Sequence, residues 1–555
     1  MNPSARLEFP PHLALRPDYL VWKCVGCVLA LLVSLPLLLI FAQWSTFGSG
    51  EQDIWQHLLD TKLDRLAVNT VVLLLGVGAG VSVLGVSLAW LVSLCEFPGR
   101  RLFEWALMLP LAIPGYVMAF VFLGTFNYAG PVQTALRASF GTDVWFPDMQ
   151  GVGAVTLVFT LVLYPYVYML ARVAFLAQGR NLMDAARILG LRPGTAFLRV
   201  ALPVARPAIA AGVALALMET LADFGAVAVF NFDTFTTAIY SAWYGLFNLT
   251  VAAQLASLLL LFVAVALALE QYGRREARHT QDGKPRQQPG YALSGARAAG
   301  AWLLCTVVLG LAFVLPLVQL LLWVLRAPEG DGLDARYLQF LGHSLGLGGG
   351  AALVTVALAL ILAMVSRLPG SGGMRRWQRL SVRIATLGYA LPGSVLAVGI
   401  MLLFISVDRE LATLFALGPF MVGSLFALVL AYVIRFLAVA HAPIDSGLQG
   451  IKPAVIEAAR SLGAAPSRIL RDVYVPLLRP GLVTALLLVF VDVMKEMPAT
   501  LILRPFGWDT LAVRIYQMTA EGQWERAALP ALTLLLAGLM PVILLVKQSR
   551  RSTAP

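Results

Sequence analysis

Acidic side chains occur inside two long apolar stretches, where a charged group is costly. The first stretch carries Glu219 and Asp223, and the second carries Asp492, Lys495 and Glu496. A shift of 273 residues takes Glu219 to Asp492 and Asp223 to Glu496 (492 − 219 and 496 − 223). Charges at membrane depth usually face a cavity or the interior of a helix bundle, and they mark pathways for substrate or ions. These five residues are therefore candidates for a translocation path or gate.

Two roles stay open for these carboxylates. Residues four apart on a helix share one face, so Glu219 and Asp223 are expected to point together toward a central interface, as a cation-tolerant path requires. Alternatively, Asp492 and Glu496 pair with Lys495 or cap the ends of broken helices, and serve structure alone. The five histidines are scattered along the chain, which argues against a soft-metal site. We assign no metal ligands.

The composition places these residues in a membrane protein. Hydrophobic residues make up 59% of the 555-residue chain and charged residues 13%, whereas soluble proteins have about 45–50% and about 25%. Apolar runs of about 20 residues, long enough to cross a bilayer as a helix, occur twelve times, six in each half. We predict an all-α integral membrane protein of two tandem six-helix halves related by pseudo-two-fold symmetry.

The predicted halves span residues 1–270 and 298–555, and a polar cytoplasmic linker at 271–297 joins them. Pro114-Gly115 and Pro392-Gly393 fall inside the third helix of each half and predict a break there, since proline interrupts the hydrogen-bond ladder. The expected helices lie near 21–43, 67–95, 103–126, 150–173, 206–230 and 248–270, and then near 298–325, 343–366, 381–406, 416–438, 478–502 and 527–547.

The positive charges follow the pattern of a membrane protein. The net charge is +11, but Lys and Arg gather in alternate connections between the apolar runs, as the positive-inside rule describes. This pattern argues against nucleic acid as a partner and places both termini and the basic connections in the cytoplasm. The residues assigned to the cytoplasmic side are Arg6, Arg16, Lys23, Arg100, Arg101 and those within 172–206, 274–297, 367–383, 435–479 (Arg435 included) and 547–551.

One loop of the chain occurs twice, at 174–207 and at 440–480. Its matching positions keep the same offset of 273 (457 − 184), which makes chance similarity improbable. Each copy has a glycine, expected in the left-handed conformation that ends a helix. A proline three residues later, Pro193 or Pro466, is expected to begin a new helix in a different direction. The small and basic residues suit a docking surface for another protein. The copies are Asp184, Ala185, Ala186, Arg187, Gly190 and Pro203, and Glu457, Ala458, Ala459, Arg460, Gly463 and Pro476.

The repeated loop resembles the EAA motif of ABC-importer permeases. Asp184 replaces the usual Glu in the first copy, and Val475 replaces the usual Leu before proline in the second. The resemblance implies that each loop is a coupling helix seated in a groove of a separate ATPase subunit. It further implies one fused chain in the bacterial inner membrane, resting on an ATPase homodimer and receiving substrate from a periplasmic binding protein.

The chain has no ATPase motif of its own. A GxxxxGK[ST] phosphate-binding loop does not occur, because Gly283-Lys284 lacks the upstream glycine and precedes Pro285. We therefore expect no enzyme activity and no cofactor in this chain. By the resemblance, ATP and Mg²⁺ are bound by the partner ATPase.

The residues around the intramembrane carboxylates are similar to those of fused permeases of ferric-iron importers. The similar segments are 218–226 and 235–240 in the first half, and 495–500 and 503–512 in the second. They imply Fe(III) as the substrate. Permeases for thiamine, polyamines or phosphonates share the architecture and remain alternatives. A secondary transporter driven by an ion gradient would share the helix count, but it would leave the two repeated loops unexplained.

Overall fold

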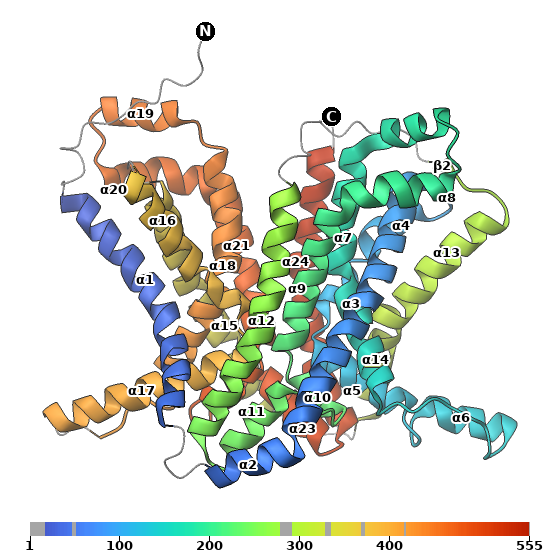
Figure 1. Ribbon diagram of the computed structural model, residues 1–555, viewed down its shortest axis with the longest axis horizontal. Helices are drawn as coiled ribbons and strands as arrows, with labels where there is room; N and C mark the ends of the chain where they lie inside the picture. Colours follow the sequence, from blue (N-terminus) through green and yellow to red (C-terminus); the bar gives the residue numbers. More distant parts are fainter. Residues whose placement is uncertain are drawn as a thin grey trace. The chain divides into compact units, whose positions relative to one another are not determined.

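The computed structural model describes residues 17–46, 52–277, 291–327, 335–367, 372–415 and 418–553. Within these ranges, ten helices are long and apolar enough to cross a membrane, and two bent helix pairs raise the number to twelve if each counts as one span. The predicted all-α membrane architecture is confirmed. The chain forms two compact units, unit 1 (Met1–Thr46 and Gln339–Thr510) and unit 2 (Phe47–Leu338 and Leu511–Pro555) (Figure 1).

Unit 2 is built around four long helices. Helix α7 (Val152–Ile188) packs against α3 (Leu63–Leu94) and α9 (Leu202–Ala222), and α9 packs against α12 (Leu249–Ala277) (Figure 1). Glycine allows α3 to approach α7 closely, since a Cβ at Gly85 would lie 2.7 Å from Val167 Cβ. Small residues at helix contacts are typical of membrane proteins, in which close packing holds helices together.

Unit 2 also contains the first and last spans of the predicted second half. Helix α14 (Leu315–Arg326), which continues α13 (Ala296–Leu309), packs against α24 (Trp524–Thr553) and α5 (Gly115–Phe126). Two short strands, β1 (Cys95–Glu96) and β2 (Tyr291–Ala292), pair in parallel with Cys95 opposite Tyr291. Of the predicted linker at 271–297, residues 278–290 lie outside the described ranges.

Unit 1 contains the central spans of the second half together with the first helix of the chain. Helix α1 (Pro17–Ala42) packs against α16 (Gly372–Ala385) and α17 (Gly393–Phe415), and α18 (Leu425–Gln449) packs against α21 (Val475–Lys495). The first span of each sequence repeat therefore packs with helices of the other repeat. The packed units do not coincide with the sequence halves, and the boundaries proposed for those halves stay a prediction.

The third span of each half, expected near 103–126 and near 381–406, is broken at its Pro-Gly pair. The chain bends by 94° in the first case and by 116° in the second. Pro114 and its counterpart Pro392 cause the breaks, because proline has no N–H to donate to a helix ladder. The Pro-Gly breaks are confirmed, and bends of this size exceed a simple kink. The pieces are α4 (Arg100–Ala106), η3 (Leu109–Ala112) and α5, and α16, η6 (Leu387–Ala390) and α17.

The fifth span of each half ends earlier than predicted. Helices over 206–230 and 478–502 were expected, but α9 ends at Ala222 and α21 at Lys495. A short helix follows each end, α10 (Gly225–Val229) and α22 (Pro498–Leu503). The other short helices are η2 (Gln43–Thr46), α2 (Gln52–Thr61), α6 (Pro131–Phe140), α8 (Pro193–Ala196), α11 (Phe235–Tyr244), α19 (Pro453–Ser461), α20 (Pro466–Ile469) and α23 (Leu511–Ala520).

A π-helical turn precedes three of the prolines that open helices. The turns are η4 (Phe197–Ala201) before Pro203, η5 (Gly310–Val314) before Pro316, and η7 (Leu470–Tyr474) before Pro476. A proline ring clashes with the carbonyl four residues earlier in a regular helix. A wider turn at that carbonyl relieves the clash while the chain stays helical.

We predict that Gly388→Ala destabilises the protein. A Cβ at Gly388 would lie 1.9 Å from the backbone oxygen of Ile434, so η6 and α18 must separate, at a cost of about 1–3 kcal/mol for overpacking. Thermal unfolding in detergent, followed by tryptophan fluorescence, measures the loss. Gly349→Ala is the matched control, since no atom lies within 4 Å of its Cβ position. An equal melting temperature for both variants would contradict the prediction.

Candidate functional site

The repeated loop has the same backbone ending in both copies. Gly190 has φ of 83° and Gly463 has φ of 78°. The Leu191 N–H donates to the Ala186 carbonyl at 3.0 Å, and the Ala464 N–H donates to the Ala459 carbonyl at 3.1 Å. These bonds satisfy carbonyl groups at the end of each helix. The predicted left-handed glycines are confirmed.

The helix before the glycine differs between the copies. In the first copy, α7 runs past its expected end at residue 173 to Ile188, so Asp184 to Arg187 belong to a 37-residue helix. In the second copy, the nine-residue helix α19 carries Glu457 to Arg460 and is separate from α18. Pro453 begins this separate helix, and the first copy has no proline at the corresponding place.

Apolar side chains are exposed beside both glycines. Ile188 and Leu189 are 87% and 82% exposed, and Leu462 is 88% exposed. Ala186 is buried, whereas Glu457 and Ala458 are exposed. The side chains of Asp184, Ala185, Arg187 and Arg460 lie outside the described part. Each loop therefore presents a helix end, a sharp turn and an apolar side chain on its surface.

Asp223 caps the break after α9. It lies beyond the last helical residue with φ of −74° and ψ of 129°, so it does not share a helix face with Glu219, and that expectation was wrong. Its Oδ1 accepts a hydrogen bond from the Ala226 N–H at 2.6 Å, at the start of α10. The Thr236 hydroxyl donates to the Asp223 carbonyl at 2.9 Å. Glu219 stays within α9 and is half-buried.

Glu496 caps the equivalent break after α21. Its Oε1 accepts from the Ala499 N–H at 3.0 Å, and the Thr500 hydroxyl donates to its carbonyl at 2.6 Å. Its Oε2 lies 3.2 Å from Arg435 Nε, in an ion pair whose side chains are 5% and 11% exposed. Asp492 and Lys495 lie within α21 and are half-buried. Asp223 and Glu496 thus cap broken helices, one of the two roles left open.

Each capping carboxylate faces the Pro-Gly break of the third span in its own unit. A Cβ at Gly115 would lie 2.6 Å from Asp223 Oδ2, and a Cβ at Gly393 would lie 2.4 Å from Glu496 Oε1. Only glycine leaves room for a carboxylate at that distance. Two broken spans therefore meet in each unit, with a carboxylate between them.

Sequence reasoning missed Arg435. It was assigned to the cytoplasmic side with the other basic residues, but it lies inside α18, buried beside Glu496. Its Nη1 also donates to the Leu391 carbonyl, at 3.4 Å, just before the Pro392 break. The sequence does carry a signal for it: Arg435 stands within an apolar run, and an arginine in such a run needs an acidic partner.

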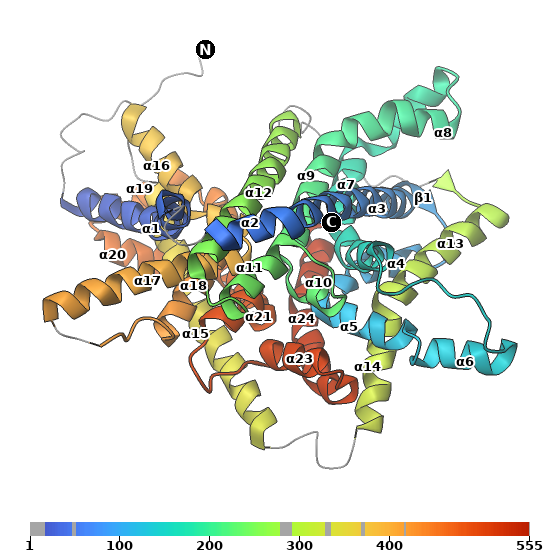
Figure 2. The same ribbon diagram turned by 60° about the horizontal axis from the view of Figure 1, so that its bottom comes forward.

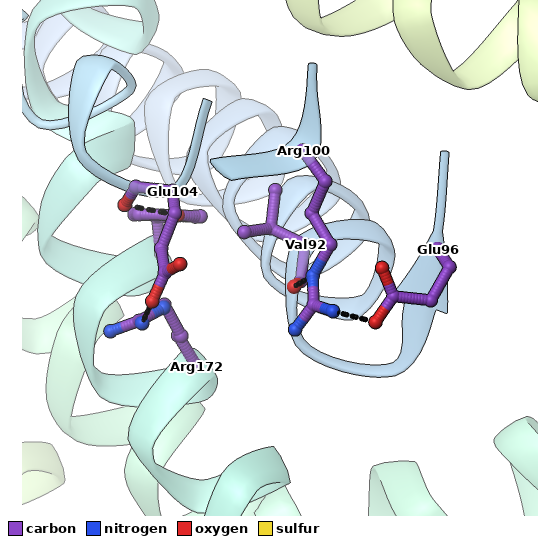
Figure 3. Close-up of polar contacts among 6 residues, drawn as sticks. Val92, Glu96, Arg100, Glu104 and Arg172 are labelled. Atoms are coloured by element: carbon purple, nitrogen blue, oxygen red, sulfur yellow. Dashed lines mark hydrogen bonds and ion pairs between the residues drawn. The ribbon is translucent and has the colours of Figure 1, made fainter. Parts of the chain in front are cut away.

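Ion pairs connect the end of α3, helix α4 and the middle of α7 in unit 2. Arg100 pairs with Glu96 and donates to the Val92 carbonyl at 2.7 Å, and Arg172 pairs with Glu104 (Figure 3). The Tyr168 hydroxyl donates to the Glu104 carbonyl at 2.9 Å. The contacts tie α7 to α4 twelve residues before Asp184 (184 − 172). They position the part of α7 that leads into the first repeated loop.

Two stretches of the chain, which contain the repeated loops and the capped breaks, match one protein family. The family described as "binding-protein-dependent transport system inner membrane component" matches residues 81–275 and 335–553. The chain belongs to this family. It is therefore a multi-pass inner membrane protein, the permease subunit of an ABC importer that works with a binding protein and lacks the ATPase. Each match contains one copy of the repeated loop.

Curated relatives of this permease cover much of its length. The Fe(3+)-transport system permease protein FbpB 2 of Haemophilus influenzae is 27% identical over 530 residues, 94% of this chain and 97% of the relative. The probable ABC transporter permease protein y4fN of Sinorhizobium fredii is 26% identical over 88% of each chain. The molybdenum transport system permease protein ModB of Escherichia coli is 32% identical over 33% of this chain and 80% of the relative.

We predict that Glu496→Gln strongly destabilises the permease, because it leaves Arg435 buried without its counter-charge. Removing one partner of a buried pair costs about 3–5 kcal/mol, whereas an apolar replacement of the pair is often close to neutral. The double variant Arg435→Met with Glu496→Gln should therefore recover most of the melting temperature. Glu219→Gln is the control for a half-buried carboxylate within a helix. A double variant no more stable than the single one would contradict this account of the pair.

Proposed function

We propose that this permease imports ferric iron delivered by a periplasmic binding protein. The support is the Fe(3+)-transport permease of H. influenzae, which is similar over nearly the whole of both chains. The segments around Asp223 and Glu496 add support, because they resemble those of ferric-iron permeases. Fe(III) passes through as the substrate and is not a resident cofactor.

We propose that the two repeated loops bind an ATPase homodimer. The proposed transport mechanism depends on this contact. Each copy has a left-handed glycine after a helix, and an exposed leucine directly before it, Leu189 or Leu462. Exposed apolar side chains on a rigid turn suit a groove of another protein. Two equivalent loops suit two equal ATPase subunits, which bind ATP and Mg²⁺. The alternate pattern of positive charge supports a cytoplasmic location for both loops and both termini.

The capped breaks are the proposed gate of the translocation path. Asp223 and Glu496 each lie at the end of the fifth span, beside the Pro-Gly break of the third. In this mechanism, closure of the ATPases moves the loops, and the loops move the spans that the carboxylates hold. Glu219, Asp492 and Lys495 are half-buried on the helices leading to the caps and line the same proposed path.

Uptake into proteoliposomes tests the substrate. The permease, its ATPase and its binding protein are reconstituted, and uptake of radiolabelled Fe(III) is compared with that of molybdate, thiamine, a polyamine and a phosphonate. We expect ATP-dependent accumulation of iron alone. Accumulation of another solute without iron would reject ferric iron, but it would leave the permease mechanism intact. The Arg435→Met, Glu496→Gln variant, which we expect to be stable, is assayed in parallel, and we expect it to lose uptake if the pair gates transport.

Substitutions at Gly463 test the coupling role. We predict that Gly463→Val lowers uptake several-fold, because a β-branched residue is strained by about 1–2 kcal/mol in the left-handed region. Gly463→Asn is the matched control, because asparagine tolerates that conformation. No atom lies within 4 Å of the added Cβ, so both variants should reach the membrane in normal amounts. Normal uptake and normal ATPase co-purification with Gly463→Val would overturn the assignment.

A further inference from the structure

Unit 2 contains a cavity of about 820 Å³ that the proposed transport mechanism does not use. It lies between the C-terminal ends of α5 and α14 and the N-terminal ends of α6 and α24. Figure 2 shows α5, α6 and α14 on the same side of this unit. Its wall contains two tryptophans, two arginines and one glutamate: Trp323, Trp524, Arg326, Arg526 and Glu525.

The tryptophans form a fixed aromatic wall. Phe120 stacks against Trp323 at 5.9 Å and against Trp524 at 6.2 Å between ring centroids. A Cβ at Gly124 would lie 2.8 Å from the Trp323 ring, so the indole lies directly over that glycine. Tryptophan is enriched where a membrane protein meets the lipid headgroups. The wall therefore places the cavity at the level of the headgroups.

The surface beside the cavity is apolar and faces outward. Leu321, Leu322 and Leu325 on the last turns of α14 are 43%, 40% and 82% exposed, directly before Arg326. On a membrane-spanning helix such a surface contacts acyl chains. An arginine at the end of that surface reaches the lipid phosphates. Arg326 thus stands between the cavity, which it lines, and this apolar surface.

We propose that this cavity binds the headgroup of a phospholipid with an amine, such as phosphatidylethanolamine. Arg326 and Arg526 supply charge for the phosphate, and the amide groups in the first turns of α6 and α24 favour an anion there. Glu525 supplies the charge for the ammonium group, and the indole faces of the two tryptophans attract it as well. The acyl chains lie along the leucines of α14.

Bound phospholipid is measured by native mass spectrometry of the purified permease after washing with detergent and reloading from vesicles of phosphatidylethanolamine, phosphatidylglycerol or phosphatidylcholine. We expect one phosphatidylethanolamine per chain in the wild type. The double variant Arg326→Gln with Arg526→Gln should retain at least five-fold less. Ala138→Trp, an exposed position that lines the cavity, should exclude the lipid without removing a charge. Arg336→Gln is the control, an exposed arginine at the start of α15 (Ala335–Ser366) that does not line the cavity.

The outcomes separate the possible ligands. If the Glu525→Gln variant retains more phosphatidylglycerol relative to phosphatidylethanolamine than the wild type does, recognition of the amine is supported. Equal lipid retention by the double variant and the wild type would overturn the proposal. Displacement of the lipid by inorganic phosphate would show a free-anion site and overturn it as well. Unchanged lipid retention with loss of binding-protein-stimulated ATP hydrolysis would assign the cavity to protein docking instead.

Discussion

A broken helix inside a membrane leaves backbone N–H and C=O groups that lipid cannot satisfy, and this constraint shapes both units. Each exposed group costs several kcal/mol in hydrocarbon, so non-helical backbone persists only where protein or trapped water covers it. Asp223 and Glu496 meet the constraint by accepting from the first N–H groups of the short helices that follow. Each carboxylate can reach its position because a glycine stands opposite. Each carboxylate therefore caps the break of its own span and lies beside the break of the third span.

A carboxylate used as a helix cap inside the membrane loses its hydration, which costs free energy that an uncharged cap would not. This cost favours a role in transport. A serine or threonine caps a helix without a charge to desolvate. Glu496 needs Arg435 for neutralisation, and Arg435 also reaches the carbonyl before Pro392. Three segments therefore depend on one ion pair: α18, the break before α17 and the break after α21. In the proposed mechanism this pair is the element that is made in one state and broken in the other.

The sequence predicts the features that repeat and misses those that depend on tertiary contacts. The offset of 273 residues identifies Gly190 and Gly463, because a glycine in the left-handed region leaves a local signal. The end of α9 was missed because the apolar pattern continues through Asp223 into Val227 and Phe230, and only Phe224-Gly225 hints at a stop. Arg435 was misplaced because charge counts assume that arginines seek water. The packing of α1 and α14 with the opposite repeat leaves no local signal, since any apolar helix face suits any other.

One helix in each unit connects the repeated loop to the capped break. Helix α9 follows the first loop and ends at Asp223, and α21 follows the second and ends at Glu496; each has 21 residues, or about 30 Å at 1.5 Å per residue. A π-helical turn and a proline stand at the loop end of both helices, so the loop can tilt there without breaking the helix beyond. Because the rest of the helix is regular apart from one further proline, a displacement at the loop reaches the carboxylate as a movement of a nearly rigid rod. In the proposed gate, this movement would shift Asp223 and Glu496 relative to the glycines that they face, Gly115 and Gly393.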